Sequence, residues 1–242
     1  FMNMKLKKLN TIIIGLGKIG YEYDLNKNIK KSIKTHGRAI SLHSKFELKA
    51  GIDTSLKQRD QFTNIYNVPC FKNFSLASEL ESINFVIIAT PTKKHLSSIK
   101  EVVTFSKPLA ILLEKPISDN ILDAKKIIQI CKENSITLYI NYIRKSDPGI
   151  IKIKKIVEGE VNNKKILGNI LYSKGFIHNG SHMFNLCEFW FGKMKSFDVI
   201  KVYKKINSYD YKLSVRVEFQ KSKINFIPFE DTYYDYHSIE IW

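Results

Sequence analysis

The sequence predicts an α/β protein in two parts, and three observations predict it. Short, almost uniformly apolar segments alternate with helical segments over about the first 145 residues, which is typical of a doubly wound parallel sheet. A glycine-rich turn, G-x-G-x-x-G, follows the first apolar segment. Beyond Asp147-Pro148 the pattern changes to strand-like alternation with lysines, which predicts an α+β domain with a largely antiparallel sheet.

The first part reads as strands separated by helices. A polar, lysine-rich insertion at 22–35 separates the glycine turn from a helix end and the second strand, which Asp53 closes. The last helix of this part has Ser118 as its expected N-cap, followed by acidic residues in its first turns. The expected strands are 11–14, 47–52, 69–74, 83–92, 109–116 and 136–144, and the helices following the second strand are 55–67, 93–106 and 118–135.

The second part combines helices with alternating strands. The strands end at "SIEIW", so the chain stops at Trp242 within an expected strand. The expected helices are 148–160 and 179–192, and the strands are 165–175, 196–206, 211–220, 223–230 and 238–242.

Composition limits the class of protein. The 242 residues, 44% hydrophobic, suffice for one large or two modest cores. Cys70, Cys131 and Cys187 are scattered, which favours a reducing cytoplasm and no metal site. We expect no membrane segment. The net charge of +16 is spread along the chain, so we interpret it as solvated lysine faces that favour an anionic small substrate over nucleic acid.

The glycine turn predicts a cofactor site. In a dinucleotide-binding turn, Gly15 permits the tight bend, Gly17 lets the backbone approach a pyrophosphate, and Gly20 lets the next helix pack closely. Lys18 and Ile19 lie between them and are expected at the cofactor.

Asp53 is the expected ribose ligand, because it closes the second strand. It lies further from the glycines than the usual interval of about 20 residues, in agreement with the insertion. Its carboxylate would repel a 2′-phosphate, so NAD is expected rather than NADP. Lys57 and Arg59 nearby act against that preference.

Three further segments carry a resemblance. Together with the glycine turn, "ATPTKKH" at 89–95, "EKP" at 114–116 and "GFIHNGSHMFNLCEFWFG" at 175–192 resemble the Gfo/Idh/MocA family of sugar and polyol oxidoreductases, over nearly the whole chain. "THGRAI", "NYIRKSDP" and "NGSH" look most like members linked to surface-polysaccharide sugar metabolism. The resemblance implies an N-terminal Rossmann domain, a sugar, polyol or nucleotide-sugar substrate, and a homodimer or homotetramer.

The resemblance also implies reactive residues. Lys115 of E-K-P would lie between nicotinamide and substrate, with Glu114 orienting or neutralising it. His182 would be the general base for the substrate hydroxyl. His178 stands where many members have aspartate, and Asn185 is a second departure. At helical spacing, His178 and His182 would share one face.

The remaining expectations follow the same resemblance. We expect 1–117 to bind the dinucleotide, 118–145 to complete or bridge that domain, and 146–242 to bind substrate and form oligomers. His36, His43 and His237 are expected to be surface or structural residues. The expected cofactor-binding residues are Gly15, Gly17, Lys18, Ile19, Gly20, Asp53, Thr90, Pro91, His95 and Glu114; the expected substrate-binding residues are Lys115, Asn141, Tyr142, Arg144, Asn179 and His182.

An alternative function remains open at this point. Because of His178, Asn185 and a chain shorter than usual for the family, a cofactor-binding scaffold or regulatory protein without turnover competes with the dehydrogenase. Nucleic-acid binding through the positive charge is a third, weaker reading.

Overall fold

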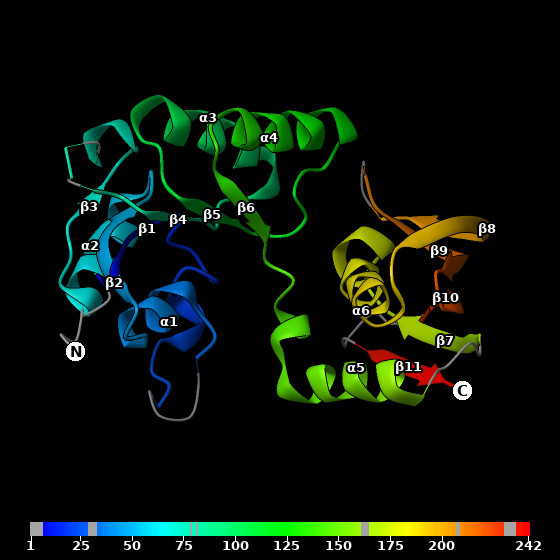
Figure 1. Cartoon of the computed structure of the whole chain (residues 1–242). Helices are drawn as coiled ribbons and strands as arrows, with labels where there is room; N and C mark the ends of the chain where they lie inside the picture. Colours follow the sequence, from blue (N-terminus) through cyan, green and yellow to red (C-terminus); the bar gives the residue numbers. More distant parts are fainter. Residues whose placement is uncertain are drawn as a thin grey trace. The chain divides into compact units, whose positions relative to one another are not determined.

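The computed structural model describes residues 7–28, 33–77, 79–80, 82–160, 165–206, 209–229 and 236–242. The chain divides into two compact units, Phe1–Asn141 and Tyr142–Trp242. Each unit has its own sheet (Figure 1). Each also has its own buried apolar residues, which form two clusters in the described part of the first unit. The predicted fold class, a parallel α/β unit followed by an α+β unit, is confirmed.

The first unit is a parallel sheet of order β3-β2-β1-β4-β5-β6. Its strand order reverses between β1 and β4, so this is the topological switch point at which open α/β sheets bind ligands. The strands are β1 (Leu9–Ile14), β2 (Phe46–Ile52), β3 (Cys70–Phe71), β4 (Phe85–Ile88), β5 (Ala110–Leu113) and β6 (Thr137–Ile140). The helices are α1 (His36–Leu42), α2 (Leu56–Tyr66), α3 (His95–Phe105) and α4 (Ile121–Glu133), with short 3-10 turns η1 (Glu22–Asp24), η2 (Ser75–Ala77) and η3 (Thr92–Lys94).

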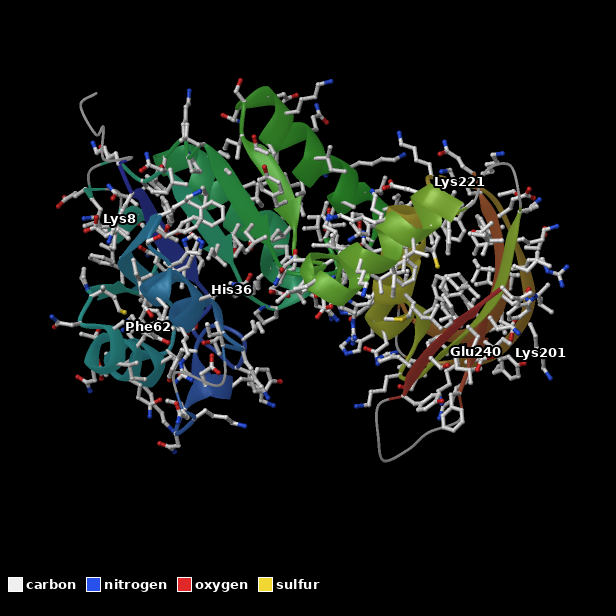
Figure 2. All side chains as sticks on the ribbon, turned by 60° about the horizontal axis from the view of Figure 1, so that its bottom comes forward. Lys8, His36, Phe62, Lys201, Lys221 and Glu240 are labelled. Carbon is white, nitrogen blue, oxygen red and sulfur yellow. The ribbon has the colours of Figure 1, made fainter. Side chains whose placement is uncertain are left out.

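Both faces of this sheet are covered, since the three successive isoleucines that end β1, Ile12 to Ile14, are all buried. Ile12 and Ile14 belong to one buried cluster with residues of α3 and α4. Ile13 belongs to another with residues of α1 and α2, among them the fully buried Phe62 (Figures 1 and 2). Alternation of side chains across a strand therefore explains why a β-branched run fits between two helical layers.

The start of α4 differs from the prediction. Asn120, and not Ser118, is the N-cap, and its side-chain oxygen accepts the backbone N–H of Asp123 at 2.8 Å. The Ser118 hydroxyl instead accepts the N–H of Asn120 at 3.3 Å, so it forms the turn before the helix. Both residue types are good caps, and the extended conformation at Asn120 decides between them.

The second unit is a five-stranded sheet of order β11-β7-β10-β9-β8. Its neighbours are antiparallel except for β7 and β10, which run parallel. The strands are β7 (Ile166–Tyr172), β8 (Met194–Lys205), β9 (Tyr211–Phe219), β10 (Ser222–Pro228) and β11 (His237–Ile241). The helical elements are the 3-10 turn η4 (Ile143–Ser146), α5 (Pro148–Glu160), the π-helix η5 (Phe176–Gly180) and α6 (Ser181–Phe191).

The core of this unit lies between the sheet and α6. Met183, Leu186 and Phe191 of α6 are buried with the inward residues of β7, β9 and β10. Trp190 Nε1 donates to the carbonyl of Ile150 at 3.1 Å and so joins α6 to α5. The edge strand β8 is exposed along its whole length, and Lys201 lies at the outer side of this sheet (Figure 2). Within the ranges that the structure describes, no helix is both long enough and apolar enough to cross a membrane.

Candidate active site

Each of the three glycines in the glycine turn is required for a different structural reason. Gly15 has φ +93, and a Cβ there would lie 2.6 Å from the backbone carbon of Ala89. A Cβ at Gly20 would lie 2.5 Å from the Gly15 oxygen. At Gly17, by contrast, a Cβ would have no heavy atom of the described residues within 4 Å, apart from those of Gly17 and its two chain neighbours. The turn is therefore closed toward the sheet and open above Gly17, as a backbone that receives a pyrophosphate requires.

Asp53 joins the end of β2 to this turn. Its Oδ2 accepts the backbone N–H of Leu16 at 2.8 Å, and its Oδ1 accepts that of Ser55, also at 2.8 Å. Each carboxylate oxygen keeps a second lone pair for a hydroxyl. Arg59 Nη1 donates to the carbonyls of Asp53 at 2.7 Å and Thr54 at 3.0 Å. The position fits a ribose ligand held beside the pyrophosphate turn.

The loop after β4 is fixed by His95. The ring is only 1% exposed; Nε2 lies 3.0 Å from the Thr90 carbonyl and Nδ1 lies 3.2 Å from the Ile117 carbonyl. His95 thus ties the Thr90-Pro91 loop to the segment after β5. Because the His95 ring is buried, its role at a cofactor would be indirect: it would hold Thr90 and Pro91 in place.

The E-K-P segment lies at the carboxyl end of β5. The Glu114 carboxylate oxygen Oε1 lies 2.8 Å from His36 Nε2 and accepts Asn141 Nδ2 at 2.6 Å. Burial acts to raise the pKa of Glu114, but the hydrogen bonds from His36, Asn141 and the Lys115 N–H outweigh it, so the pKa lies below its usual range. Asn141, expected at the substrate, is therefore hydrogen-bonded to Glu114, expected at the cofactor.

His36 shows where sequence reasoning was incomplete. It is 9% exposed and forms the first residue of α1, so the expectation of a surface position is wrong and a structural role remains. Its partner is 78 residues away, and no local pattern indicates such a pair. His43, at the other end of α1, is exposed as expected.

In the second unit, Tyr142 packs against His182. The two rings are edge to face, with centroids 5.6 Å apart and planes at 86°. Burial raises the pKa of the Tyr142 hydroxyl, and a hydrogen bond with Ser181 offsets this only in part. The contact restricts the orientation of the His182 ring.

The turn carrying His178 is π-helical. The expectation of a shared face for His178 and His182 relied on α-helical spacing, which residues 176–180 do not have. His178 is exposed, whereas Asn179 is buried. The side-chain oxygen of Asn185 is buried and accepts no hydrogen bond from the part of the chain that the structure describes.

Asp210 positions this π turn, and the sequence did not indicate it. It is fully buried, its Oδ1 accepts the backbone N–H of Ile177 at 2.8 Å, and its Oδ2 accepts that of His178 at 2.9 Å. Gly175 has φ +98, and a side chain there would collide with the Asp210 carboxylate. The helix bearing the two histidines thus begins on a carboxylate delivered by the start of β9.

A cavity of about 660 Å³ lies in the second unit. Its apolar side includes Met183, Leu186 and Ile239, and Arg144 and His237 lie among its polar lining. Its size suits a small ligand. In the described ranges, no group of His, Cys, Asp and Glu is arranged to hold a metal ion.

Two relatives by sequence carry oxidoreductase names. The uncharacterized oxidoreductase YrbE of Bacillus subtilis is 26% identical over 163 residues, which are 66% of this chain and 43% of YrbE. The NADP-dependent D-xylose 1-dehydrogenase of Haloarcula marismortui is 27% identical over 88 residues, 36% of this chain and 24% of that protein. The chain thus spans less than half the length of these curated relatives.

Solved structures share the fold at low identity. The apo scyllo-inositol dehydrogenase of Lactobacillus casei has a TM-score of 0.75 and 17% identity, covering 98% of this chain and 73% of that one. The WlbA dehydrogenase of Bordetella pertussis, solved with NADH and UDP-GlcNAcA, has a TM-score of 0.73 and 16% identity, covering 91% and 67%.

The family profile covers the whole region that carries the glycine turn, Asp53 and E-K-P. It is described as "Oxidoreductase family, NAD-binding Rossmann fold" and matches residues 9–142, more than half of the chain. With the fold and the turn geometry in agreement, the chain belongs to the GFO_IDH_MocA oxidoreductase family.

Proposed function

We propose that this chain is the cofactor-binding and reactive part of an NAD-dependent oxidoreductase that transfers a hydride between a nicotinamide cofactor and a sugar, polyol or nucleotide-sugar hydroxyl or carbonyl. The observation that carries the proposal is the glycine turn at the switch point, open above Gly17 and joined to Asp53 through Leu16. We assign residues 1–117, completed by 118–145, to the cofactor and 146–242 to substrate and oligomer contacts.

The chemistry divides between two side chains. When bound, NAD supplies the acceptor for the hydride of the substrate C–H bond. Lys115 donates a hydrogen bond from its ammonium group to the reacting oxygen, which lowers the pKa of a substrate hydroxyl. His182 accepts the hydroxyl proton and returns it in the reverse direction, with its ring held by Tyr142.

The preference for NAD is supported by the environment of Asp53. A 2′-phosphate would meet its carboxylate, and Arg59, one of the two nearby cations that could pair with such a phosphate, donates to backbone carbonyls. Similar proteins differ in this respect: the xylose dehydrogenase is named for NADP, whereas the WlbA dehydrogenase was solved with NADH.

A nucleotide sugar is the substrate class we favour. Arg144 is exposed in the lining of the 660 Å³ cavity, where it could pair with a phosphate, and the net charge of +16 attracts anions. The UDP-GlcNAcA bound to WlbA is a ligand of this class.

An oligomer is supported by β8. Apolar side chains along this strand are about half exposed, among them Phe197, Ile200 and Tyr203. An apolar edge of this kind is typical of a surface covered by another subunit, so we propose a homodimer or homotetramer. Light scattering on purified protein tests it, and a monomer at micromolar concentration contradicts it.

The proposed function is tested by cofactor binding and turnover. NADH should bind at least ten times more tightly than NADPH by fluorescence titration, and Asp53→Ser should narrow that ratio. Gly17→Val should reduce NADH affinity by about 100-fold or more, because the valine side chain would occupy the space that the pyrophosphate needs. The melting temperature should not change, because that space is open in the protein without cofactor. Gly159→Val is the matched control, since that helical glycine also has no described heavy atom within 4 Å of a Cβ position.

Turnover separates the enzyme from the scaffold. NAD reduction is measured with a panel of sugars, polyols and nucleotide sugars. Tight NADH binding without reduction by any of them would favour the non-catalytic alternative. Equal affinity for NADH and NADPH in the unmodified protein contradicts the role of Asp53.

A further inference from the structure

The buried pair of His36 and Glu114 connects two segments that the proposed function uses separately. The same Glu114 oxygen, Oε1, accepts hydrogen bonds from His36 Nε2 at 2.8 Å and from Asn141 Nδ2 at 2.6 Å. The side chain of His36 is 10% exposed and that of Glu114 is 15% exposed. Donors from α1 and from the end of β6 thus converge on the end of β5, one residue before Lys115.

The position of His36 is set by the glycine turn. Its backbone N–H donates to the Ile19 carbonyl at 3.0 Å, and that of Gly37 donates to the Gly20 carbonyl at 2.8 Å. On the other side, the Thr35 hydroxyl donates to the buried Asp24 at 2.7 Å. Hydrogen bonds therefore run without a break from the glycine turn through His36 to Glu114.

Glu114 needs these donors to remain ionised. Burial is the largest influence on its pKa and acts to raise it; the bonds from His36 and Asn141 reverse the effect. Among the described donors to this carboxylate, His36 is titratable, while Asn141 and the Lys115 N–H are neutral donors. Loss of His36 would leave a buried carboxylate with one side-chain donor, which favours protonation or movement of the β5 end.

We propose that His36 is a positioning residue: it holds the Glu114 side chain in place, and so connects the glycine turn to the presentation of Lys115. The proposal rests on the proposed function, in which Lys115 acts on the reacting oxygen. In this proposal His36 acts through Glu114 and not by direct contact with cofactor or substrate. The presentation of Lys115 then depends on an imidazole whose backbone is held by the glycine turn.

The first test uses the protein without cofactor. Carbon-13 NMR of side-chain carboxyl groups follows the titration of Glu114, assigned with Glu114→Gln. His36→Leu should raise its midpoint by about one pH unit or more. His36→Gln, which keeps a donor, should raise it less, and His43→Leu on the exposed end of α1 should not change it. An unchanged midpoint in folded His36→Leu would overturn the proposal.

The second test uses kinetics. His36→Leu should lower kcat about 10-fold or more, with NADH affinity within about three-fold of the unmodified protein, and His36→Gln should recover most of the loss. In the Glu114→Gln background, His36→Leu should add little, because the two act as a unit. Equal kcat losses in His36→Leu and His36→Gln would contradict positioning through a hydrogen bond.

The two tests also separate this inference from the proposed function. If the unmodified protein turns over none of the panel, the proposed function fails, and the coupling to Lys115 fails with it. The titration arm still decides whether His36 holds Glu114. If His36→Leu does not fold, His36→Ala replaces it, since it also removes the imidazole donor and should raise the Glu114 midpoint likewise; an unchanged midpoint in folded His36→Ala would overturn the proposal.

Discussion

The two units hold their candidate reactive side chains in different ways. In the first, Lys115 follows a strand end braced by side chains: Glu114 accepts bonds from His36 and Asn141. In the second, Asp210 accepts backbone N–H groups at the start of the helix that bears His178 and His182. A strand end offers few unpaired backbone groups and needs side-chain partners, whereas a helix N-terminus offers several N–H groups to one carboxylate.

The largest expected effect tests whether both units contribute to the chemistry. Lys115→Ala and His182→Ala should each lower turnover by about 100-fold or more, because each removes an interaction with the reacting oxygen or its proton. NADH affinity should change far less. His178→Ala should have a smaller effect, and His178→Asp should preserve or improve turnover. Steady-state kinetics measures all four, and normal turnover in His182→Ala would refute the proton-transfer role.

The next effect tests the carboxylate under the helix. Asp210→Asn replaces one acceptor oxygen by a donor, facing the N–H of Ile177 or His178. We expect a loss of about 2 kcal/mol in the free energy of unfolding of the second unit, the scale of hydrogen bonds to a charged group. Urea unfolding measures the loss. NADH binding to the first unit serves as the internal control and should not change. A loss of NADH binding free energy as large as the loss of stability would contradict the view that the two units hold their reactive side chains independently.

The smallest effect concerns pH. Because the folded-state pKa of Glu114 is lowered, its contribution to stability is present above the unfolded pKa and is lost as pH falls through the folded pKa. The stability difference between the unmodified protein and Glu114→Gln should therefore be about 1 kcal/mol near pH 7 and shrink in acid. Denaturation at pH 7 and pH 3 checks it, and a difference that grows in acid would reverse the sign argued here.

Much of the fold was predictable because its signals are local. The apolar runs, the glycine turn and Asp53 after β2 are each recognised from a few adjacent residues, and a strand or helix overlaps each segment that these patterns predict. Predicted strands such as 136–144 and 83–92 are too long: the first ends at Ile140, before η4, and the second ends at Ile88, before η3. The start of α4 was misplaced by two residues, because Ser118 and Asn120 are both good caps and only the backbone conformation distinguishes them.

The supporting residues of the candidate site could not be predicted. His36 reaches Glu114 across 78 residues, and Asp210 reaches Ile177 across 33. No periodicity or spacing in the sequence indicates either pair, because each pair forms only when elements distant in the sequence pack together. The π turn at 176–180 depends likewise on the buried Asp210 and the left-handed conformation at Gly175.

The topology of β7 has a consequence for how the second unit forms during synthesis. This strand pairs with β10, which begins at Ser222, and with β11, which begins at His237, so both partners leave the ribosome long after it does. Meanwhile Met183, Leu186 and Phe191 of α6 have no completed sheet to cover them. Translation at about 5–20 residues per second leaves this apolar helix face uncovered for several seconds, the interval in which a nascent chain needs a chaperone most.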